Sequence, residues 1–111
     1  MVTAAYTPAR GDAVWLTFDP QAGHEHAGRR PALVLSPRSY NQKTGLAILC
    51  PITSKVKGYP FEVAVTGRKI GGVVLADQIK NLDWRVRRAE FIETISEHIV
   101  KEALRKLRLL V

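Results

Sequence analysis

The sequence predicts a mainly β fold with helices: a compact antiparallel barrel closed by one C-terminal α-helix. Short runs that are apolar, or that alternate with period two, recur along the chain between glycine, proline and polar turns. From about Ser96 the apolar residues take up helical spacing instead. Five or six short strands followed by one amphipathic helix favour a barrel on which that helix packs.

Local composition justifies each strand. AVWLTFD is rich in aromatic and aliphatic residues and ends at Pro20, and ALVLS and LAILC are short apolar runs. FEVAV alternates with period two, and Gly67 and the Gly71-Gly72 pair mark a hairpin-like crossing into VVLA. We therefore expect strands at 13–19, 32–36, 46–50, 61–65, 73–76 and 87–94.

The connecting segments are less regular. The stretch 21–30 has two glycines and no apolar period, so we expect a loop, and NQKTG at 41–45 is expected to form a turn. DQIKNLD at 77–83 is expected to form a short helical turn. For the final helix, Thr94 or Ser96 is the candidate cap. Its apolar face is expected to comprise Ile99, Val100, Ala103, Leu104, Leu107 and Val111.

Length and composition bound the class of protein. The 111 residues fit a single domain over 1–111. No export signal and no apolar stretch long enough to span a membrane is visible, so we expect a cytoplasmic protein. Cys50 is the only cysteine, which excludes an intrachain disulfide, and its apolar surroundings predict a buried, inert thiol.

The charge is strongly basic. Seventeen Lys and Arg residues against ten Asp and Glu give a net charge of +7 and a pI near 10.0. Such a balance suits a polyanion such as RNA or DNA, and it also suits an acidic protein partner. The charges are dispersed over the chain, which favours a binding groove over a basic tail.

One loop concentrates chemistry. GHEHAGRRP at 23–31 brings together His24, Glu25, His26, Arg29 and Arg30. RNA cleavage without a metal requires a base, an acid and positive charge on the phosphorane; Glu25 or a histidine can act as base, and an arginine fork suits phosphate oxygens. Pro31 biases Arg30 toward extended backbone geometry. Because adjacent side chains of an extended segment point to opposite sides, Arg29 is expected to point away from Arg30. The alternative is a solvated loop whose charges neutralise each other.

A second segment, PITSKVKG, places the hydroxyls of Thr53 and Ser54 just past a strand end, followed by lysines that include Lys57. This arrangement can hold a phosphate, although an ordinary basic loop is the alternative. The chain has no glycine-rich phosphate loop, and its carboxylates are thinly spread. We therefore expect neither a metal site nor a cofactor.

Five stretches in order carry a resemblance to a known family. They are GDAVWLTFDP (11–20), GHEHAGRRPALVLSP (23–37), YNQKTG (40–45), PITSKVKGYPFEV (51–63) and GVVLADQIKNLDWR (72–85). Together they resemble the MazF/PemK (Kid) family of toxin endoribonucleases, from about Gly11 to Arg88 and more weakly through the final helix.

The resemblance implies an SH3-like, or plasmid-maintenance-toxin, barrel that forms a homodimer. It implies a toxin of a type II toxin–antitoxin system that cuts single-stranded RNA, chiefly mRNA, sequence-selectively and without a metal ion or other cofactor. The products would carry a 2′,3′-cyclic phosphate and a 5′-hydroxyl. The implied protein partner is an acidic, MazE-like antitoxin lying over the RNA groove.

Residue by residue, the family pattern assigns the base to Glu25, transition-state stabilisation to Arg30 and phosphate orientation to Thr53. The implied substrate-binding residues are His24, Ser54, Lys57, Asp77, Gln78 and Phe18. An aromatic residue in a strand, such as Phe18, is more often core than a stacking platform. Trp15 and Trp84 are expected to pack. His26 and Arg29 depart from the family pattern and bear on which bases are read.

Two other functions remain open at this point. A non-catalytic nucleic-acid-binding barrel of the same fold would share the basic charge, and fold alone does not fix function. A gyrase-inhibiting toxin on the same barrel would need a protein-binding surface in place of a cleavage site. The carboxylate of Glu25 near the arginine of Arg30 favours the nuclease, because a pure binder has no use for it.

Overall fold

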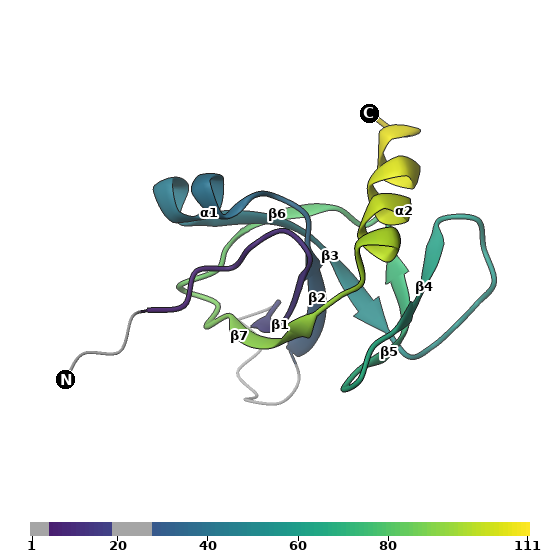
Figure 1. The fold of residues 1–111 in the computed structure, drawn as a ribbon, viewed down its shortest axis with the longest axis horizontal. Helices are drawn as coiled ribbons and strands as arrows, with labels where there is room; N and C mark the ends of the chain where they lie inside the picture. The colour runs from purple at the N-terminus through teal and green to yellow at the C-terminus, as the bar shows by residue number, and fades with distance from the viewer. Residues whose placement is uncertain (1–4, 19–27) are drawn as a thin grey trace.

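The computed structural model of the chain describes residues 5–18 and 28–111 (Figure 1). Seven strands form one strongly curved antiparallel sheet, and two helices lie at different ends of it (Figure 1). In chain order the elements are β1 (Asp12–Thr17), β2 (Arg29–Val34), α1 (Arg38–Thr44), β3 (Leu46–Thr53), β4 (Glu62–Thr66), β5 (Gly71–Leu75), β6 (Lys80–Asp83), β7 (Glu90–Thr94) and α2 (Glu97–Arg108).

The strand order is β4-β5-β3-β2-β1-β7, with β6 on β3. β3 is the central strand because it changes partners along its length. On one edge it pairs with β2, ending at Ala32↔Pro51. On its other edge β6 pairs with its first half and β5 with its end, at Ile52 and Thr53. β2 and β3 therefore separate just where β3 joins β5.

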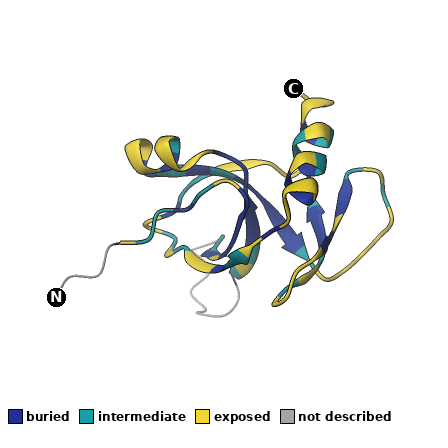
Figure 2. Cartoon of the chain, in the orientation of Figure 1, coloured by how far each residue is buried: buried dark blue, intermediate teal, exposed yellow. Residues whose placement is uncertain are grey.

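Two apolar clusters fill the two sides of the sheet. One lies under α2, which buries Ile99, Val100, Ala103 and Leu107 against β3, β4 and β5. The other is built around Leu16, Leu49 and Trp84. Figure 2 shows the buried face of α2 turned toward the sheet. Each fully buried aliphatic side chain of this kind contributes about 1.5–3 kcal/mol.

Most expected elements are confirmed. Every expected strand is present within a few residues of its expected bounds. The final helix follows Ser96, which occupies the cap position without a side-chain hydrogen bond. The expectation that Val111 belongs to its apolar face is wrong, because α2 ends at Arg108 and Val111 is 88% exposed. Cys50 is fully buried, and burial raises the pKa of its thiol to about 12, which suppresses the reactive thiolate.

Two further expectations are wrong. The segment 41–45 is not a turn, because it forms most of α1, which ends at Gly45 in the left-handed region at φ 75°. Asn41 is completely buried there and donates from its side chain to the carbonyl of Pro8 at 2.8 Å. The segment 77–83 is not a helical turn either, because Lys80–Asp83 is strand β6, paired along Leu46–Leu49.

The boundary of β2 also differs from expectation. Arg29 and Arg30 were expected in the loop 21–30, yet they are the first residues of the strand. Pro31 lies inside the strand opposite Trp15, and it holds its predecessor extended. In the part of the chain that the structure describes, neither helix is long and apolar enough to cross a membrane.

Candidate active site

Arg30 and Thr53 come together where β2 and β3 part. The last bridge between these strands is Ala32↔Pro51, and each residue lies two positions beyond it on its own strand. Both line the same two adjoining cavities, of about 350 and 250 Å³. The two residues singled out in separate sequence segments therefore form one site.

The two neighbouring arginines have different environments. The guanidinium of Arg29 donates to the hydroxyl of Thr17 at 3.1 Å, to the carbonyl of Arg88 at 2.8 Å and to the carboxylate of Glu90 at 3.1 Å. Arg30 is exposed and donates no side-chain hydrogen bond to any residue in the ranges 5–18 and 28–111. Arg29 points elsewhere than Arg30, as expected, and its hydrogen bonds tie β2 to β7. Arg30 lines the two cavities.

The first cavity has an aromatic wall. Trp15 lines it beside Arg30, together with Ser54, Ile70 and Gly71. The expectation that Trp15 only packs is wrong, because 39% of this residue is exposed. It lies on β1 opposite Pro31, and both residues line this cavity together with Arg30.

Trp84 does pack as expected. It is 7% exposed, its indole N–H donates to the carbonyl of Asn41 at 2.9 Å, and Arg85 lies 4.8 Å over its ring. Phe18 is half-buried against the same cluster and lines neither of the two cavities around Arg30. Its surroundings match the packing alternative.

The second cavity is basic apart from Glu62, which also lines it. Lys55, Lys57, Tyr59 and Gln78 line it, so two of the expected substrate-binding residues, Lys57 and Gln78, lie beside Arg30 and Thr53. Asp77 does not line it directly. Its carboxylate accepts a hydrogen bond from the hydroxyl of Tyr59 at 2.9 Å, which places that ring at the cavity wall. Tyr59 carried no signal in the sequence.

Local bonding orients Thr53. Its hydroxyl oxygen accepts from the backbone N–H of Lys55 at 3.1 Å, which leaves its own proton able to donate outward. β5 approaches its backbone very closely: a Cβ added to Gly72 would lie 2.1 Å from the carbonyl oxygen of Thr53. Gly72 also has φ +124°, which a residue with a side chain rarely adopts. Only glycine fits here.

Glu25 and His24 lie outside the described residues, as does His26. The assignment of Glu25 as base and of His24 as a substrate contact therefore stays a prediction. The described part of the site supplies the cationic and hydroxyl groups, and the base is expected from the segment that joins β1 to β2.

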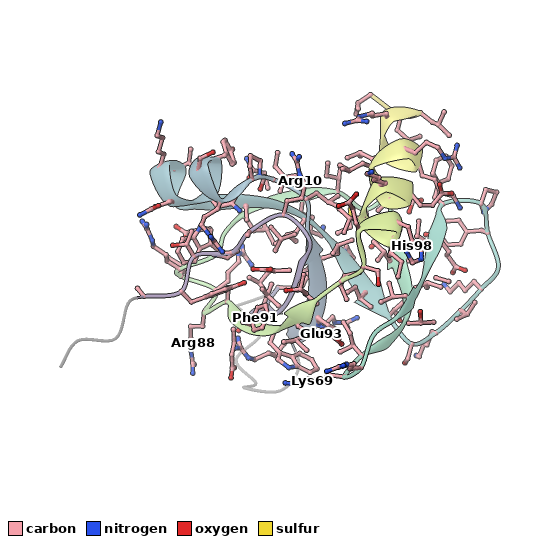
Figure 3. The ribbon with its side chains drawn as sticks, viewed as in Figure 1. Arg10, Lys69, Arg88, Phe91, Glu93 and His98 are labelled. Atoms are coloured by element: carbon pink, nitrogen blue, oxygen red, sulfur yellow. The ribbon has the colours of Figure 1, made fainter. Side chains whose placement is uncertain are left out.

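Glu93, which no sequence motif singled out, holds the other wall of the site. Its carboxylate accepts the backbone N–H groups of Arg68, Lys69 and Ile70 at 2.8–3.0 Å, so one side chain of β7 fastens the tip of the β4–β5 hairpin (Figure 3). Ile70 belongs to this tip and lines the first cavity. These hydrogen bonds, that of Lys69 foremost, hold the pKa of the Glu93 carboxyl below its usual range.

The lowered pKa predicts a pH-dependent contribution to stability. The carboxylate of Glu93 stabilises the fold fully above its unfolded-state pKa, and this stabilisation is lost as the pH falls through the lower folded-state pKa. We expect Glu93→Gln to lower the Tm at pH 7, because the amide keeps only one acceptor oxygen for three N–H groups.

The difference in Tm between Glu93→Gln and the wild type should shrink in thermal unfolding series taken from pH 7 to pH 3. Glu97→Gln is the matched control, since that exposed carboxylate meets only Lys101, and its effect on the Tm should be smaller. A Tm difference between Glu93→Gln and the wild type that is the same at pH 7 and at pH 3 would contradict the proposed contribution of the Glu93 carboxylate.

Comparisons with known proteins agree on one family. Residues 9–111 match the model of the PemK-like, MazF-like toxins of type II toxin–antitoxin systems. The chain is 44% identical over 110 residues to the endoribonuclease toxin MazF of Escherichia coli strain K12, covering 99% of both chains. The crystal structure of MazF from Deinococcus radiodurans is 53% identical with a TM-score of 0.86, covering 96% of this chain and 97% of that one. A MazE-MazF crystal structure from the same organism is 48% identical with a TM-score of 0.85, covering 96% of each chain.

Proposed function

Because this chain belongs to the PemK-like, MazF-like family of type II toxins and is an endoribonuclease, we propose that it cleaves single-stranded RNA at Arg30 and Thr53 without a metal ion. The observation that carries this proposal is the convergence of an arginine fork and a threonine hydroxyl on one open space flanked by lysines. A guanidinium offers two parallel donors to phosphate oxygens, and the hydroxyl adds a third.

In the proposed reaction Glu25 takes the proton of a ribose 2′-hydroxyl. The 2′-oxygen attacks the adjacent phosphorus, and the bond from phosphorus to the 5′-oxygen breaks. The leaving 5′-oxygen takes a proton from water and Glu25 returns its own proton to the solvent, so the products are a 2′,3′-cyclic phosphate and a 5′-hydroxyl. Arg30 stabilises the charge that develops on the phosphorane, and Thr53 orients the phosphate.

The surrounding residues favour RNA as substrate. Lys55 and Lys57 lie where flanking phosphates would run, and each lysine–phosphate contact releases counterions from the strand. The exposed ring of Trp15 lies beside Arg30, where an unpaired base can stack. Stacking of this kind contributes about 1–3 kcal/mol per base and requires a base that is not held in a duplex. Ser54 and Gln78 are proposed as further RNA contacts and set the sequence preference together with His24.

We further propose two partners. An acidic antitoxin would cover the RNA groove, since the net charge of +7 suits an acidic chain as well as RNA, and relatives from Deinococcus radiodurans are solved as MazE-MazF structures. The second partner is another copy of the chain, forming a homodimer. A cytoplasmic location follows from the proposed mRNA substrate.

Cleavage in the presence of EDTA tests the function. A mixed-sequence single-stranded RNA is incubated with the protein in excess EDTA, and the fragment ends are analysed. We expect discrete fragments with 5′-hydroxyl and 2′,3′-cyclic phosphate ends. Binding of varied RNAs without cleavage would instead indicate a nucleic-acid-binding or gyrase-inhibiting protein on the same fold.

The role of Glu25 has its own test. Glu25→Gln should lower the cleavage rate about 10²–10⁴-fold, because the amide cannot accept the 2′-hydroxyl proton. The acidic limb of the pH–rate profile should disappear with it. The profile is measured between pH 5 and 9 under single-turnover conditions, and an unchanged shape would transfer the base role to His24 or His26.

A further inference from the structure

A largely buried carboxylate, that of Glu62, lines the basic cavity beside the lysines. Glu62 is the first residue of β4 and is only 9% exposed. Its two oxygens accept the backbone N–H groups of Lys57 at 2.9 Å and of Gly58 at 2.8 Å. Gly58 has φ +84°, the left-handed conformation that favours glycine. Both carboxylate oxygens are thus engaged on two consecutive peptide groups of one loop.

The same loop is held from its other side by α2. The ammonium of Lys106 donates to the carbonyl of Pro60 at 2.6 Å and to that of Glu62 at 3.0 Å. Lys106 is half-buried and reaches these carbonyls across 44 or more positions in sequence. A charge-assisted hydrogen bond of this length is roughly twice as strong as a neutral one.

The loop 54–61 that these two residues hold has no strand partner of its own, since β3 ends at Thr53 and β4 begins at Glu62. It nevertheless carries Lys55 and Lys57, which line the cavity beside Arg30. An eight-residue connection without pairing would sample many backbone conformations, and each would move its lysines. Fixing its backbone therefore fixes where the cations lie.

We propose that Glu62 and Lys106 are positioning residues for RNA binding, which act through the backbone of loop 54–61 to hold Lys55 and Lys57 in place. The inference rests on the proposed function and adds two residues whose role runs through the loop backbone; Glu62 itself also lines the cavity. Glu62 sets the peptide groups next to the lysines, and Lys106 links that arrangement to the helix. Binding groups act efficiently only when they are held in place, and a misplacement of about 1 Å can cost on the order of a hundredfold in rate.

Glu62→Gln and Lys106→Met test this proposal in the full-length protein. The glutamine amide of the first variant would keep one acceptor oxygen, and the methionine of the second keeps the length of the lysine without its donors. We expect the KM for a single-stranded RNA oligonucleotide to rise about tenfold in Glu62→Gln and about threefold or more in Lys106→Met, with kcat within about twofold, as for a loss of uniform binding. The half-exposed Glu102 and the exposed Lys101 lie on α2 and line neither cavity. Glu102→Gln and Lys101→Met are therefore the matched controls and should leave both constants unchanged.

The salt dependence separates positioning from a general loss of stability. Each lost phosphate contact should reduce the slope of log(kcat/KM) against log salt by about 0.7 for a single strand. We expect a shallower slope in Glu62→Gln, whereas a variant that is merely less stable keeps the slope of the wild type. If Glu62→Gln fails to fold by circular dichroism, the Lys106→Met measurements decide the proposal.

A double-mutant cycle completes the test. In a Lys55→Met/Lys57→Met background, Glu62→Gln should change KM by less than about twofold, because the groups it positions are gone. Equal effects with and without the lysines, or a wild-type KM and slope in the single variants, would overturn the proposal. Absence of RNA cleavage by the wild-type protein in EDTA would instead refute the proposed function.

Discussion

We expect the Arg30→Ala variant to lose RNA cleavage by at least about 10³-fold while keeping its fold. Arg30 lines both cavities, and its guanidinium is the group proposed to face the charge that develops on the phosphorane. Removal of one such preorganised donor typically costs about 10²–10³ in rate, and an arginine acting on a transferring phosphoryl group costs more. Its side chain is exposed, so the free energy of unfolding should change by no more than about 0.5 kcal/mol.

Single-turnover cleavage of a labelled RNA, with thermal unfolding alongside, measures both quantities. Arg30→Lys keeps the charge and should recover only part of the rate, because an ammonium cannot form the two parallel hydrogen bonds of the fork. Arg108→Ala removes an equal charge at the end of α2 and should cleave like the wild type. Activity retained in Arg30→Ala would remove this residue from the mechanism.

The second large effect is expected at Gly72. An alanine there would place its Cβ 2.1 Å from the carbonyl oxygen of Thr53, and the backbone angle of +124° disfavours any side chain. The contact is with backbone, so β5 or the end of β3 must move. We expect the free energy of unfolding to fall by about 2–3 kcal/mol and cleavage to fall about a hundredfold, since Thr53 moves with its strand.

Gly71→Ala is a closely matched control. Its added Cβ would lie 3.6 Å from the carbonyl oxygen of Val65, an ordinary contact, and this glycine does not have a left-handed φ. Chemical denaturation and cleavage assays on the two variants compare the same substitution at adjacent positions. Equal unfolding free energies and equal cleavage rates in the two alanine variants would show that the close approach of β5 to Thr53 does not control the geometry of the site.

The sequence predicted those parts of the fold in which local pattern and tertiary structure agree. The strands around Val14, Leu33 and Leu49 are apolar runs that remain fully buried, and the helical period after Ser96 matches the buried face of α2. Gly45 and Gly67 marked strand ends correctly, whereas Pro31 and Pro51 lie inside β2 and β3. These elements can be predicted without knowing their contacts with residues distant in sequence.

The errors occurred where tertiary contacts override local composition. Asn41 is a typical turn residue, but here its side chain is buried and bonded to Pro8, so its segment folds as α1. Lys80–Asp83 has little strand character of its own and becomes β6 because β3 offers it an edge. Trp15 was assigned to the core, since nothing in its own strand shows that its face of the sheet is open.

The site divides in the same way. Arg30 lies in a segment with an unusual concentration of charged groups, and Thr53 was singled out through the family resemblance; the structure brings the two to the same cavities. Glu62, Glu93 and Lys106 were not predictable, because each is a single charged residue in an otherwise ordinary strand or helix. Their importance lies in the backbone groups that they bind, and those groups come from other parts of the chain.

The pairing of the first strand with the last has a consequence for synthesis. β1 finds β7 only when Glu90–Thr94 has been made, and the ammonium of Lys106 arrives later still. A ribosome releases the chain from its N-terminus, so an unfinished copy lacks the strand that completes the sheet and both side chains that fasten the cavity walls. During synthesis the sheet therefore cannot close on β1 until the chain has been made past Thr94.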